Sequence, residues 1–279
     1  MRHILNKLAI DELIEKTLFE DVQNGDVTTR NIFSGDQTGK ANIIARENLI
    51  LCGLEICQAV FNKLTNKALF TSCSHQDGDE IKEGNTILKI ECGLIPLLEG
   101  ERCALNILQW LSGIATLTNK FVKKASPVKV LDTRKTTPGL RIFEKYAVNC
   151  GGGINHRMGL YDQILIKDNH IEAAGSISNA INYIRNNMKK DMMVEIEVKN
   201  LEEVEEALLN KVNIIMLDNM SIEMIKKSIS LINGRAKIEI SGGVNYNSLD
   251  EISKTGADFV SVGLLTHSAP AVDISMLIT

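Results

Sequence analysis

The C-terminal half of the chain alternates between short apolar segments and amphipathic helical segments, and this alternation restricts the fold more than any other feature. Helical patterns such as LEEVEEALLN and SIEMIKKSISLI separate most of the apolar segments. Strands rich in Ile, Val and Leu that are joined by helical crossovers indicate a parallel sheet. The apolar segments, which begin near residues 128, 163, 193, 213, 237 and 258, are VKVLD, QILIKD, MVEIEV, NIIMLD, KIEIS and DFVSVG.

Both an open doubly wound sheet and a β/α barrel have this pattern, and the ends of the strands help to choose between them. Chemically active side chains fall at or just past the carboxyl ends of five strands: Arg134, Lys167, Glu197, Asp218 and Ser241. In a barrel these ends converge on one mouth, where barrel enzymes place their chemistry. We therefore favour a barrel, and an incomplete one because only six strands are clear.

The first hundred residues have a mixed α+β pattern, and one long helix follows them. The expected elements are a helix over residues 4–20, a polar turn over 21–29, strands within 41–53, a short helix over 54–64, strands within 77–93 and a strongly amphipathic helix over 99–124.

Composition and charge exclude several classes of protein. The 279 residues carry a formal net charge of −4, unlike a typical nucleic-acid-binding protein. No apolar run approaches the roughly 20 residues that a membrane helix needs, and the acid-containing N-terminus is unlike a secretory signal or transit peptide. The six cysteines form no C-x-x-C pair, which predicts reduced, mostly buried thiols in a cytoplasmic protein.

Basic residues gather in residues 134–167, a segment of net charge +4. At one barrel mouth, such a concentration predicts a polyanionic small-molecule substrate. A solvated charged face explains Glu144, Lys145 and Arg141 more simply. It explains Lys167 poorly, because this lysine ends the apolar strand ILIK.

Two carboxylates stand where a buried strand should be apolar. Glu197 lies near the end of MVEIEV and Asp218 ends NIIMLD. A buried carboxylate costs several kcal/mol unless it is paired or bound to metal, and carboxylates beside phosphates suit Mg²⁺. We assign Glu197 and Asp218 to function and expect Glu195, on the same strand face as Glu197, to form an ion pair.

Two strand ends near the C-terminus are rich in glycine: EISGGV (239–244) and SVGLLTHS (261–268). Glycine lets backbone N–H groups approach an anion, and the N-terminus of a following helix adds a favourable dipole. Because barrels often bind phosphate at the loops after their last strands, the pair predicts a phosphate site.

These residues belong to longer stretches that resemble the quinolinate phosphoribosyltransferase family, the carboxylating nicotinate-nucleotide pyrophosphorylases. DTRKTTPG and GGGINHRMGLYDQILIKDNH are long and specific enough to make chance agreement implausible. The matching stretches, in family order over nearly the whole chain, are EDVQNGDVTT (20–29), GERCALNILQWLSGIAT (100–116), DTRKTTPGLR (132–141), EKYAVNCGGGINHRMGLYDQILIKDNH (144–170), EIEV (195–198), IMLDN (215–219), EISGGV (239–244) and SVGLLTHSAPAVDISM (261–276).

The resemblance implies an incomplete, open β/α barrel with an N-terminal α/β sandwich domain. The sandwich would comprise residues 1–107, with residues 268–279 packed on it, and the barrel residues 108–267. The resemblance also implies a homodimer in which Arg102 of one chain completes the active site of the other. It does not say whether dimers assemble into hexamers.

The implied reaction transfers a phosphoribosyl group from phosphoribosyl pyrophosphate to quinolinate, with Mg²⁺, and releases pyrophosphate and CO₂. This is a step of NAD biosynthesis performed by a glycosyltransferase of the pentosyl class. The resemblance gives catalysis to Lys135, Lys167, Glu197 and Asp218, with the two carboxylates also at the metal. It gives substrate binding to Arg102, Thr133, Arg134, Lys135, His156, Arg157, Lys167, Glu197, Asp218, Ser241, Gly242, Gly243, Ser261, Val262 and Gly263.

Three alternatives stay open from the residues alone. One is a phosphoribosyltransferase of the same fold that acts on nicotinate, which would need no pocket for a second carboxylate. Another is a homologue in metal metabolism with a different acceptor. A third is a biotinyl or lipoyl carrier, because DGDEIKEGNTILKI (77–90) resembles the turns of such domains, although it shows no lysine with convincing flanks.

Overall fold

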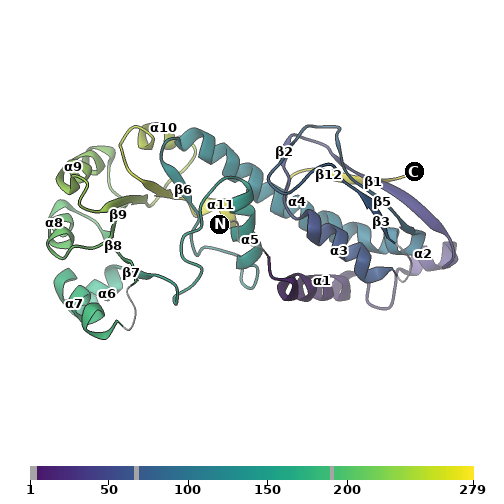
Figure 1. The fold of residues 1–279 in the computed structure, drawn as a ribbon, viewed down its shortest axis with the longest axis horizontal. Helices are drawn as coiled ribbons and strands as arrows, with labels where there is room; N and C mark the ends of the chain where they lie inside the picture. Colours follow the sequence, from purple (N-terminus) through teal and green to yellow (C-terminus); the bar gives the residue numbers. More distant parts are fainter. Residues whose placement is uncertain (1–4, 66–68, 189–191) are drawn as a thin grey trace. The chain divides into compact units, whose positions relative to one another are not determined.

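A computed structural model of the chain describes residues 5–65, 69–188 and 192–279. The chain forms two compact units (Figure 1). Unit 1 comprises Met1–Asn119, Ile142–Gly152 and Ser268–Thr279, and unit 2 comprises Lys120–Arg141 and Gly153–His267.

Unit 1 is built around an antiparallel sheet that joins both ends of the chain. Its strand order is β12 (Ile274–Ile278), β1 (Thr38–Ala45), β5 (Thr86–Gly93) and β3 (Phe70–Ser72). A separate pair is formed by β2 (Leu49–Ile50) and β4 (Glu80–Ile81). Because β4 and β5 pair with different strands, residues 77–90 do not form the lysine-presenting hairpin of a carrier domain.

The helices of unit 1 bury apolar faces. Helix α1 (Lys7–Asp21) buries Ile10, Ile14 and Leu18, and it packs against α3 (Leu54–Leu64), which buries Val60 and Phe61 among others. The predicted helices are confirmed, although the first begins at Lys7 and not at residue 4, which lies outside the described residues. The long helix α4 (Leu94–Ala125) begins five residues before its predicted start.

Two expectations for unit 1 were wrong. Part of the expected polar turn is helix α2 (Val27–Ile32), which begins because the Asp26 side chain accepts the Thr28 N–H and caps it. Helix α5 (Arg141–Cys150) carries Glu144 and Lys145, which are 0% and 1% exposed. They are therefore core residues of this unit and not a solvated charged face.

The C-terminal segment packs closely against α4 inside unit 1. A Cβ atom at Gly113 would lie 2.1 Å from the carbonyl oxygen of Pro270. Glycine is therefore required here for a close approach of two backbones, and β12 continues from this contact into the sheet. All six cysteines are free and four of them are buried, as the sequence predicts.

Unit 2 contains a six-stranded parallel sheet whose strands are those predicted from the sequence. In spatial order they are β6 (Lys129–Leu131), β11 (Phe259–Ser261), β10 (Lys237–Ser241), β9 (Ile214–Asp218), β8 (Val194–Val198) and β7 (Ile164–Ile166). Because β6 and β7 are edge strands that do not pair with each other, the barrel is open. This confirms the predicted fold class.

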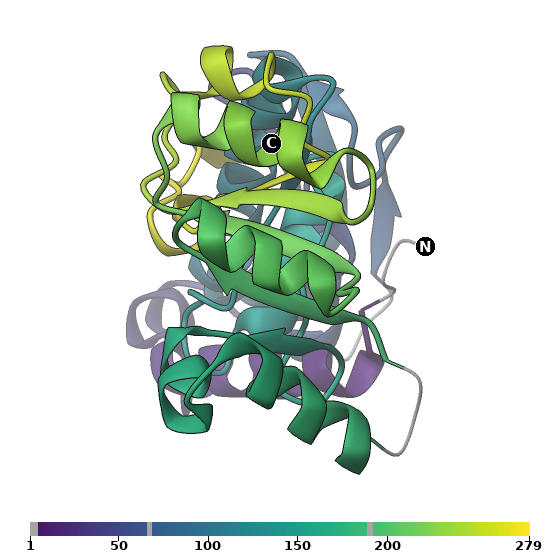
Figure 2. The same cartoon turned by 90° about the vertical axis from the view of Figure 1, so that its left-hand side faces the viewer.

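Helices cover the outer face of this sheet (Figure 2). Among the described residues, the helices that follow the strands of unit 2 are α6 (Asp168–Ala174), α7 (Ile177–Asn187), α8 (Leu201–Leu209), α9 (Ile222–Ile232), α10 (Leu249–Ile252) and α11 (Leu264–His267). Helices α7, α8 and α9 bury apolar side chains, among them Ile181, Val204 and Ile225.

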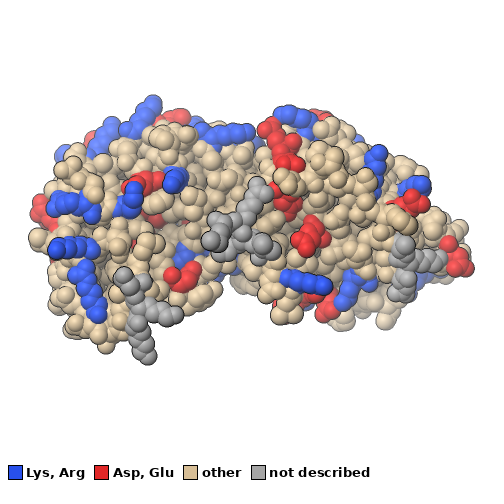
Figure 3. Space-filling view, in the orientation of Figure 1, with Lys and Arg blue, Asp and Glu red and all other residues tan. Residues whose placement is uncertain are grey.

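The surface agrees with the charge balance of the sequence. On the face shown in Figure 3, basic and acidic side chains are interspersed, and that face lacks the single-sign field typical of nucleic-acid-binding surfaces. Among the helices that the structure describes, none combines the length and apolarity needed to cross a membrane.

Candidate active site

A cavity of about 780 Å³ lies at the carboxyl ends of the parallel strands in unit 2. Glu197 comes from β8, Asp218 ends β9, Ser241 ends β10, and Lys167 follows β7 directly. The predicted convergence of strand-end residues is confirmed. The cavity is lined by Thr133, Arg134, Lys135, His156, Arg157, Leu165, Lys167, Glu197, Met216, Asp218, Asn219, Ser241, Gly242, Gly243, Val244, Ser261, Gly263, Leu264 and His267.

One part of the cavity combines a lysine with a carboxylate. The Lys167 Nζ donates to Glu197 Oε2 at 2.8 Å, and the Lys167 side chain is 44% exposed whereas that of Glu197 is 10% exposed. The backbone N–H of Lys167 donates to His170 Nδ1 at the start of α6, which fixes the lysine backbone. The ammonium group can therefore meet an incoming anion while Glu197 holds it in place.

The end of β9 presents a second carboxylate beside a tight turn. The Asn219 side chain donates to Asp218 Oδ2 at 2.6 Å, and the Asn219 backbone N–H donates to the Ser241 carbonyl at 3.0 Å. Gly242 has φ of +90°, and a Cβ there would lie 2.3 Å from Asn219 Oδ1. Only glycine fits this turn, so Gly242 brings the loop after β10 close to Asp218.

The cavity has a basic wall formed by Arg134, Lys135 and Arg157. The Lys135 backbone N–H donates to Thr133 Oγ1 at 3.0 Å, which tightens the loop after β6. Arg157 is 8% exposed, and burial, followed by repulsion from Arg134, lowers its pKa. Because these cations lie close together, an anion bound between them would relieve their repulsion.

Arg141 has a structural position, not the solvated one expected from the sequence. Its guanidinium donates to Thr136 Oγ1 and to the Met158 carbonyl, both at 2.9 Å. It therefore ties the loop after β6 to the loop that carries His156 and Arg157.

The glycine-rich loops line another side of the cavity. Gly243 has φ of +60° and open space where a Cβ would stand. Gly263 packs against the Lys135 side chain and His267. Helices α10 and α11, which follow these loops, are one turn each. The expected help from helix dipoles is therefore small, and open loop backbone remains the feature that suits a phosphate.

Two residues of the expected binding set do not line the cavity. Val262 is fully buried. Arg102 is exposed on α4 in unit 1. Among the polar residues that line the cavity, sequence reasoning missed Asn219 and His267. Asn219 directly follows Asp218, so its place at a strand end could have shown it, whereas His267 gave no such signal.

Glu195 differs from its expected role as a partner of lysine or arginine. It is 0% exposed and lies outside the cavity lining. Its carboxylate accepts from Gln163 at 2.7 Å and lies 3.3 Å from His156 Nε2. Glu197, not Glu195, thus faces the cavity.

The donor set fits a magnesium ion. Glu197 and Asp218 present carboxylate oxygens to the same cavity, and Mg²⁺ prefers one or two such ligands together with water and phosphate oxygens. These two residues could therefore hold Mg²⁺ together with a phosphorylated substrate.

Comparisons with known proteins identify the family of the chain. Residues 26–112 match the family model described as "Quinolinate phosphoribosyl transferase, N-terminal domain", and residues 114–277 match that of its C-terminal domain. The chain belongs to the quinolinate phosphoribosyltransferase family. The two matches fall in both units of the structure. The C-terminal match includes every residue that lines the cavity.

Members of the quinolinate phosphoribosyltransferase family with similar sequences come from distant organisms. A Bacillus subtilis protein named "Probable nicotinate-nucleotide pyrophosphorylase [carboxylating]" is 40% identical over 99% of this chain and 95% of its own length. The chloroplastic nicotinate-nucleotide pyrophosphorylase [carboxylating] of Arabidopsis thaliana is 39% identical over 95% of this chain and 82% of its own. Among solved structures, NadC from Streptococcus pyogenes is 43% identical, with a TM-score of 0.95 over 99% of this chain and 98% of its own.

Proposed function

We propose that the protein transfers the phosphoribosyl group of phosphoribosyl pyrophosphate to quinolinate and decarboxylates the product. The products are nicotinate mononucleotide, pyrophosphate and CO₂, in de novo NAD biosynthesis, and we expect the reaction to take place in the cytoplasm. The observation that carries this proposal is the single cavity that combines a basic wall, two carboxylates at strand ends and two glycine-containing loops.

The basic wall suits the acceptor. Quinolinate carries two carboxylates on neighbouring ring carbons, and arginine forks bind carboxylates with two parallel hydrogen bonds. Arg134, Arg157 and Lys135 supply three cations for these two charges. A nicotinate acceptor would leave part of this charge without a partner, so the wall favours the diacid.

The two carboxylates and the glycine-containing loops suit the donor, phosphoribosyl pyrophosphate. Glu197 and Asp218 would accept hydrogen bonds from the ribose hydroxyls and stabilise positive charge that develops on the ribose. Ser241, Gly242, Gly243, Ser261 and Gly263 would surround the 5′-phosphate. Lys167 would lie between the two substrates, where its ammonium can contact the phosphoribosyl group.

The chemistry has two stages. First, the pyridine nitrogen forms a bond to C1 of the ribose as the bond from C1 to the pyrophosphate oxygen breaks, and pyrophosphate leaves with that electron pair. Basic side chains neutralise the leaving charge. The ring nitrogen is then positively charged. The bond from C2 to its carboxylate breaks, CO₂ leaves, the electron pair is stabilised by the ring, and C2 takes a proton.

Magnesium is the expected cofactor. Glu197 and Asp218 would hold it, and when bound it would neutralise pyrophosphate charge in the ground state and on departure.

The proposed assembly is a homodimer. Arg102 stands exposed on α4, where it is available to the site of a second chain. Beside the edge strand β7, Leu160 and Tyr161 are 72% and 79% exposed, and large exposed apolar side chains are typical of surfaces that a partner covers. In this arrangement Arg102 adds a further cation to the neighbour's acceptor site.

A product assay tests the acceptor. Purified protein is incubated with Mg²⁺, phosphoribosyl pyrophosphate and either quinolinate or nicotinate, and the mononucleotide is measured. We expect nicotinate mononucleotide from quinolinate alone. Turnover of nicotinate, or of neither acid, would contradict the acceptor assignment.

A further inference from the structure

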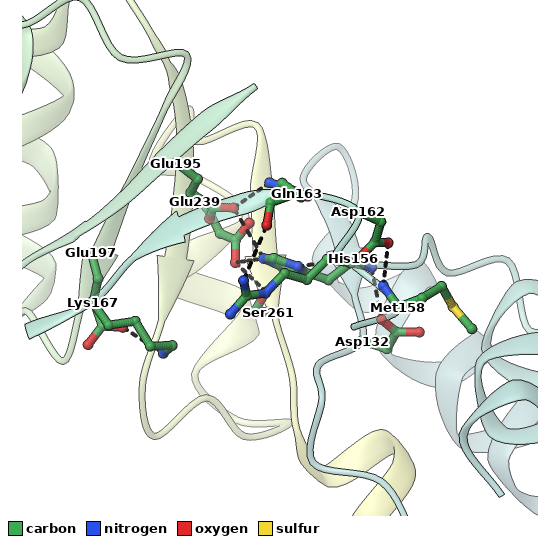
Figure 4. A network of polar contacts seen from close by, with 11 residues as sticks. Asp132, His156, Met158, Asp162, Gln163, Lys167, Glu195, Glu197, Glu239 and Ser261 are labelled. Atoms are coloured by element: carbon green, nitrogen blue, oxygen red, sulfur yellow. Dashed lines mark hydrogen bonds and ion pairs between the residues drawn. The ribbon is translucent and has the colours of Figure 1, made fainter. Parts of the chain in front are cut away.

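Two glutamates are buried in unit 2 beside the basic wall. Glu195 on β8 and Glu239 on β10 are 0% and 1% exposed, and neither lines the cavity. Figure 4 shows both carboxyl groups directed at the ring of His156. The His156 Nε2 lies 3.3 Å from Glu195 Oε2 and 3.8 Å from Glu239 Oε1. Any effect of this pair on a substrate must pass through the residues that it holds.

Burial, followed by the charge of Glu195, raises the pKa of Glu239 well above its ordinary value. The other groups that face Glu239 are His156, the more distant cation of Lys167, and the Ser261 hydroxyl, which donates to Glu239 Oε1. These surroundings favour the protonated form of the Glu239 carboxyl group.

His156 is held from several sides. The backbone N–H of Arg157 donates to His156 Nδ1 at 2.6 Å, and the His156 backbone N–H donates to Asp132 Oδ1 at 2.8 Å. A ring nitrogen that accepts a hydrogen bond carries no proton, so the ring proton of a neutral imidazole lies on Nε2 and points at Glu195.

Glu195 is linked to Arg157 as well, through Gln163. The Gln163 side chain donates to Glu195 Oε2 at 2.7 Å, while its backbone carbonyl accepts from Arg157 Nη1 at 3.2 Å. One buried carboxylate therefore anchors two side chains that line the cavity.

We propose that Glu195 and Glu239 are positioning residues for the acceptor site: their buried carboxyl groups hold the His156 ring between them, and Glu195 also holds Gln163, whose backbone carbonyl accepts from the Arg157 guanidinium. His156 then forms a shaped wall of the site, and the charge that receives the two quinolinate carboxylates comes from Arg134, Lys135, Arg157 and Lys167. This inference rests on the proposed function for the identity of the acceptor.

Two conservative substitutions separate the roles of the glutamates. Glu239→Gln keeps a side chain of the same shape and an oxygen that accepts from the Ser261 hydroxyl, so we expect the KM for quinolinate to stay within about threefold of the wild-type value. Glu195→Gln replaces the carboxylate that faces the His156 ring and accepts from Gln163 by an amide, which is a weaker acceptor, so we expect the KM for quinolinate to rise at least about tenfold, with the KM for phosphoribosyl pyrophosphate within about twofold. Equal losses in both variants, or a greater loss in Glu239→Gln, would overturn the proposal.

A third variant tests the proposal if Glu195→Gln folds poorly. Gln163→Ala leaves both glutamates in place but removes the amide link to Glu195, and we expect it to raise the KM for quinolinate about threefold to tenfold. An unchanged KM in a folded Gln163→Ala protein would count against the link to Arg157.

The ring of His156 gives a readout that needs no substrate. In protein labelled with ¹⁵N-histidine, the His156 signals are assigned by their loss in His156→Gln, and two-bond correlations report which nitrogen carries the proton. At pH 7.5 we expect the neutral Nε2–H form in wild type and Glu239→Gln. An imidazolium or an Nδ1–H form in wild type would refute the inference. If wild type turned over no quinolinate, the proposed function would fail, and this spectrum would still decide the state of the ring.

Discussion

The ammonium of Lys167 and the carboxylate of Glu197 meet at 2.8 Å across the ends of two neighbouring parallel strands, β7 and β8. Both side chains line the cavity, and the lysine is the more exposed of the two. The pair keeps a partly exposed cation at the point where the proposed donor and acceptor would meet.

Removing this cation should reduce catalysis. We expect Lys167→Ala to lower kcat/KM roughly 100-fold to 1,000-fold, the loss typical when one electrostatic contact to a transition state is deleted. Lys237→Ala is the matched control, because Lys237 pairs with Asp258 at 2.7 Å on the amino end of β10. Steady-state rates should change less than about twofold in this control. Unchanged kcat/KM in Lys167→Ala would remove Lys167 from the proposed site.

The turn after β10 should tolerate only glycine. Gly242→Ala adds a methyl group that must displace Asn219, so we expect the KM for phosphoribosyl pyrophosphate to rise at least about tenfold. Gly256→Ala is the control, since Gly256 has φ of +88°, close to the +90° of Gly242, and open space around the added methyl group. Both should lose about 1–2 kcal/mol from the left-handed backbone, measured by urea unfolding. A kinetic defect of equal size in both would show that backbone strain, and not the contact with Asn219, is responsible.

The dependence on magnesium should involve Asp218. We expect Asp218→Asn to raise the Mg²⁺ concentration for half-maximal rate about tenfold or more, since the amide is a weaker ligand. The control is Asp250→Asn, because Asp250 pairs with Lys124 away from the cavity lining. The rate is measured against Mg²⁺ after removal of bound metal with EDTA. Identical Mg²⁺ curves for Asp218→Asn and wild type would contradict the assignment.

Mixed dimers of two variants can test whether Arg102 of one chain enters the active site of the other. In a dimer of Arg102→Ala with Lys167→Ala, one site has both defects and the other has none. An equilibrated equal mixture should therefore regain about a quarter of wild-type activity. A mixture of Arg134→Ala with Lys167→Ala should regain none, because both residues belong to one barrel. No recovery in the first mixture, under conditions where subunits are shown to exchange, would mean that Arg102 does not cross between chains.

Much of the parallel sheet could be predicted because its strands are buried on both faces. Runs such as NIIMLD stand out against the polar helical segments, and any charged residue inside them marks a strand end or a site. This reasoning found Lys167, Glu197 and Asp218, which the structure brings into one cavity.

The residues whose positions could not be predicted depend on contacts that are distant in sequence. Glu144 and Lys145 read as surface residues, because nothing local shows that α5 packs inside unit 1. Asn219 and His267 enter the cavity through a turn and a one-turn helix, whose geometry depends on distant contacts. The contacts of Glu195 and Glu239 with the His156 ring join three parts of the chain that are remote in sequence.

The central claim is that one cavity joins phosphoribosyl transfer to decarboxylation. The most direct measurement uses quinolinate labelled with ¹⁴C in the C2 carboxylate and follows released CO₂ and pyrophosphate together. The account predicts that both appear in equal amounts, only when Mg²⁺ and phosphoribosyl pyrophosphate are present. Pyrophosphate without labelled CO₂, or labelled CO₂ without pyrophosphate, would contradict it.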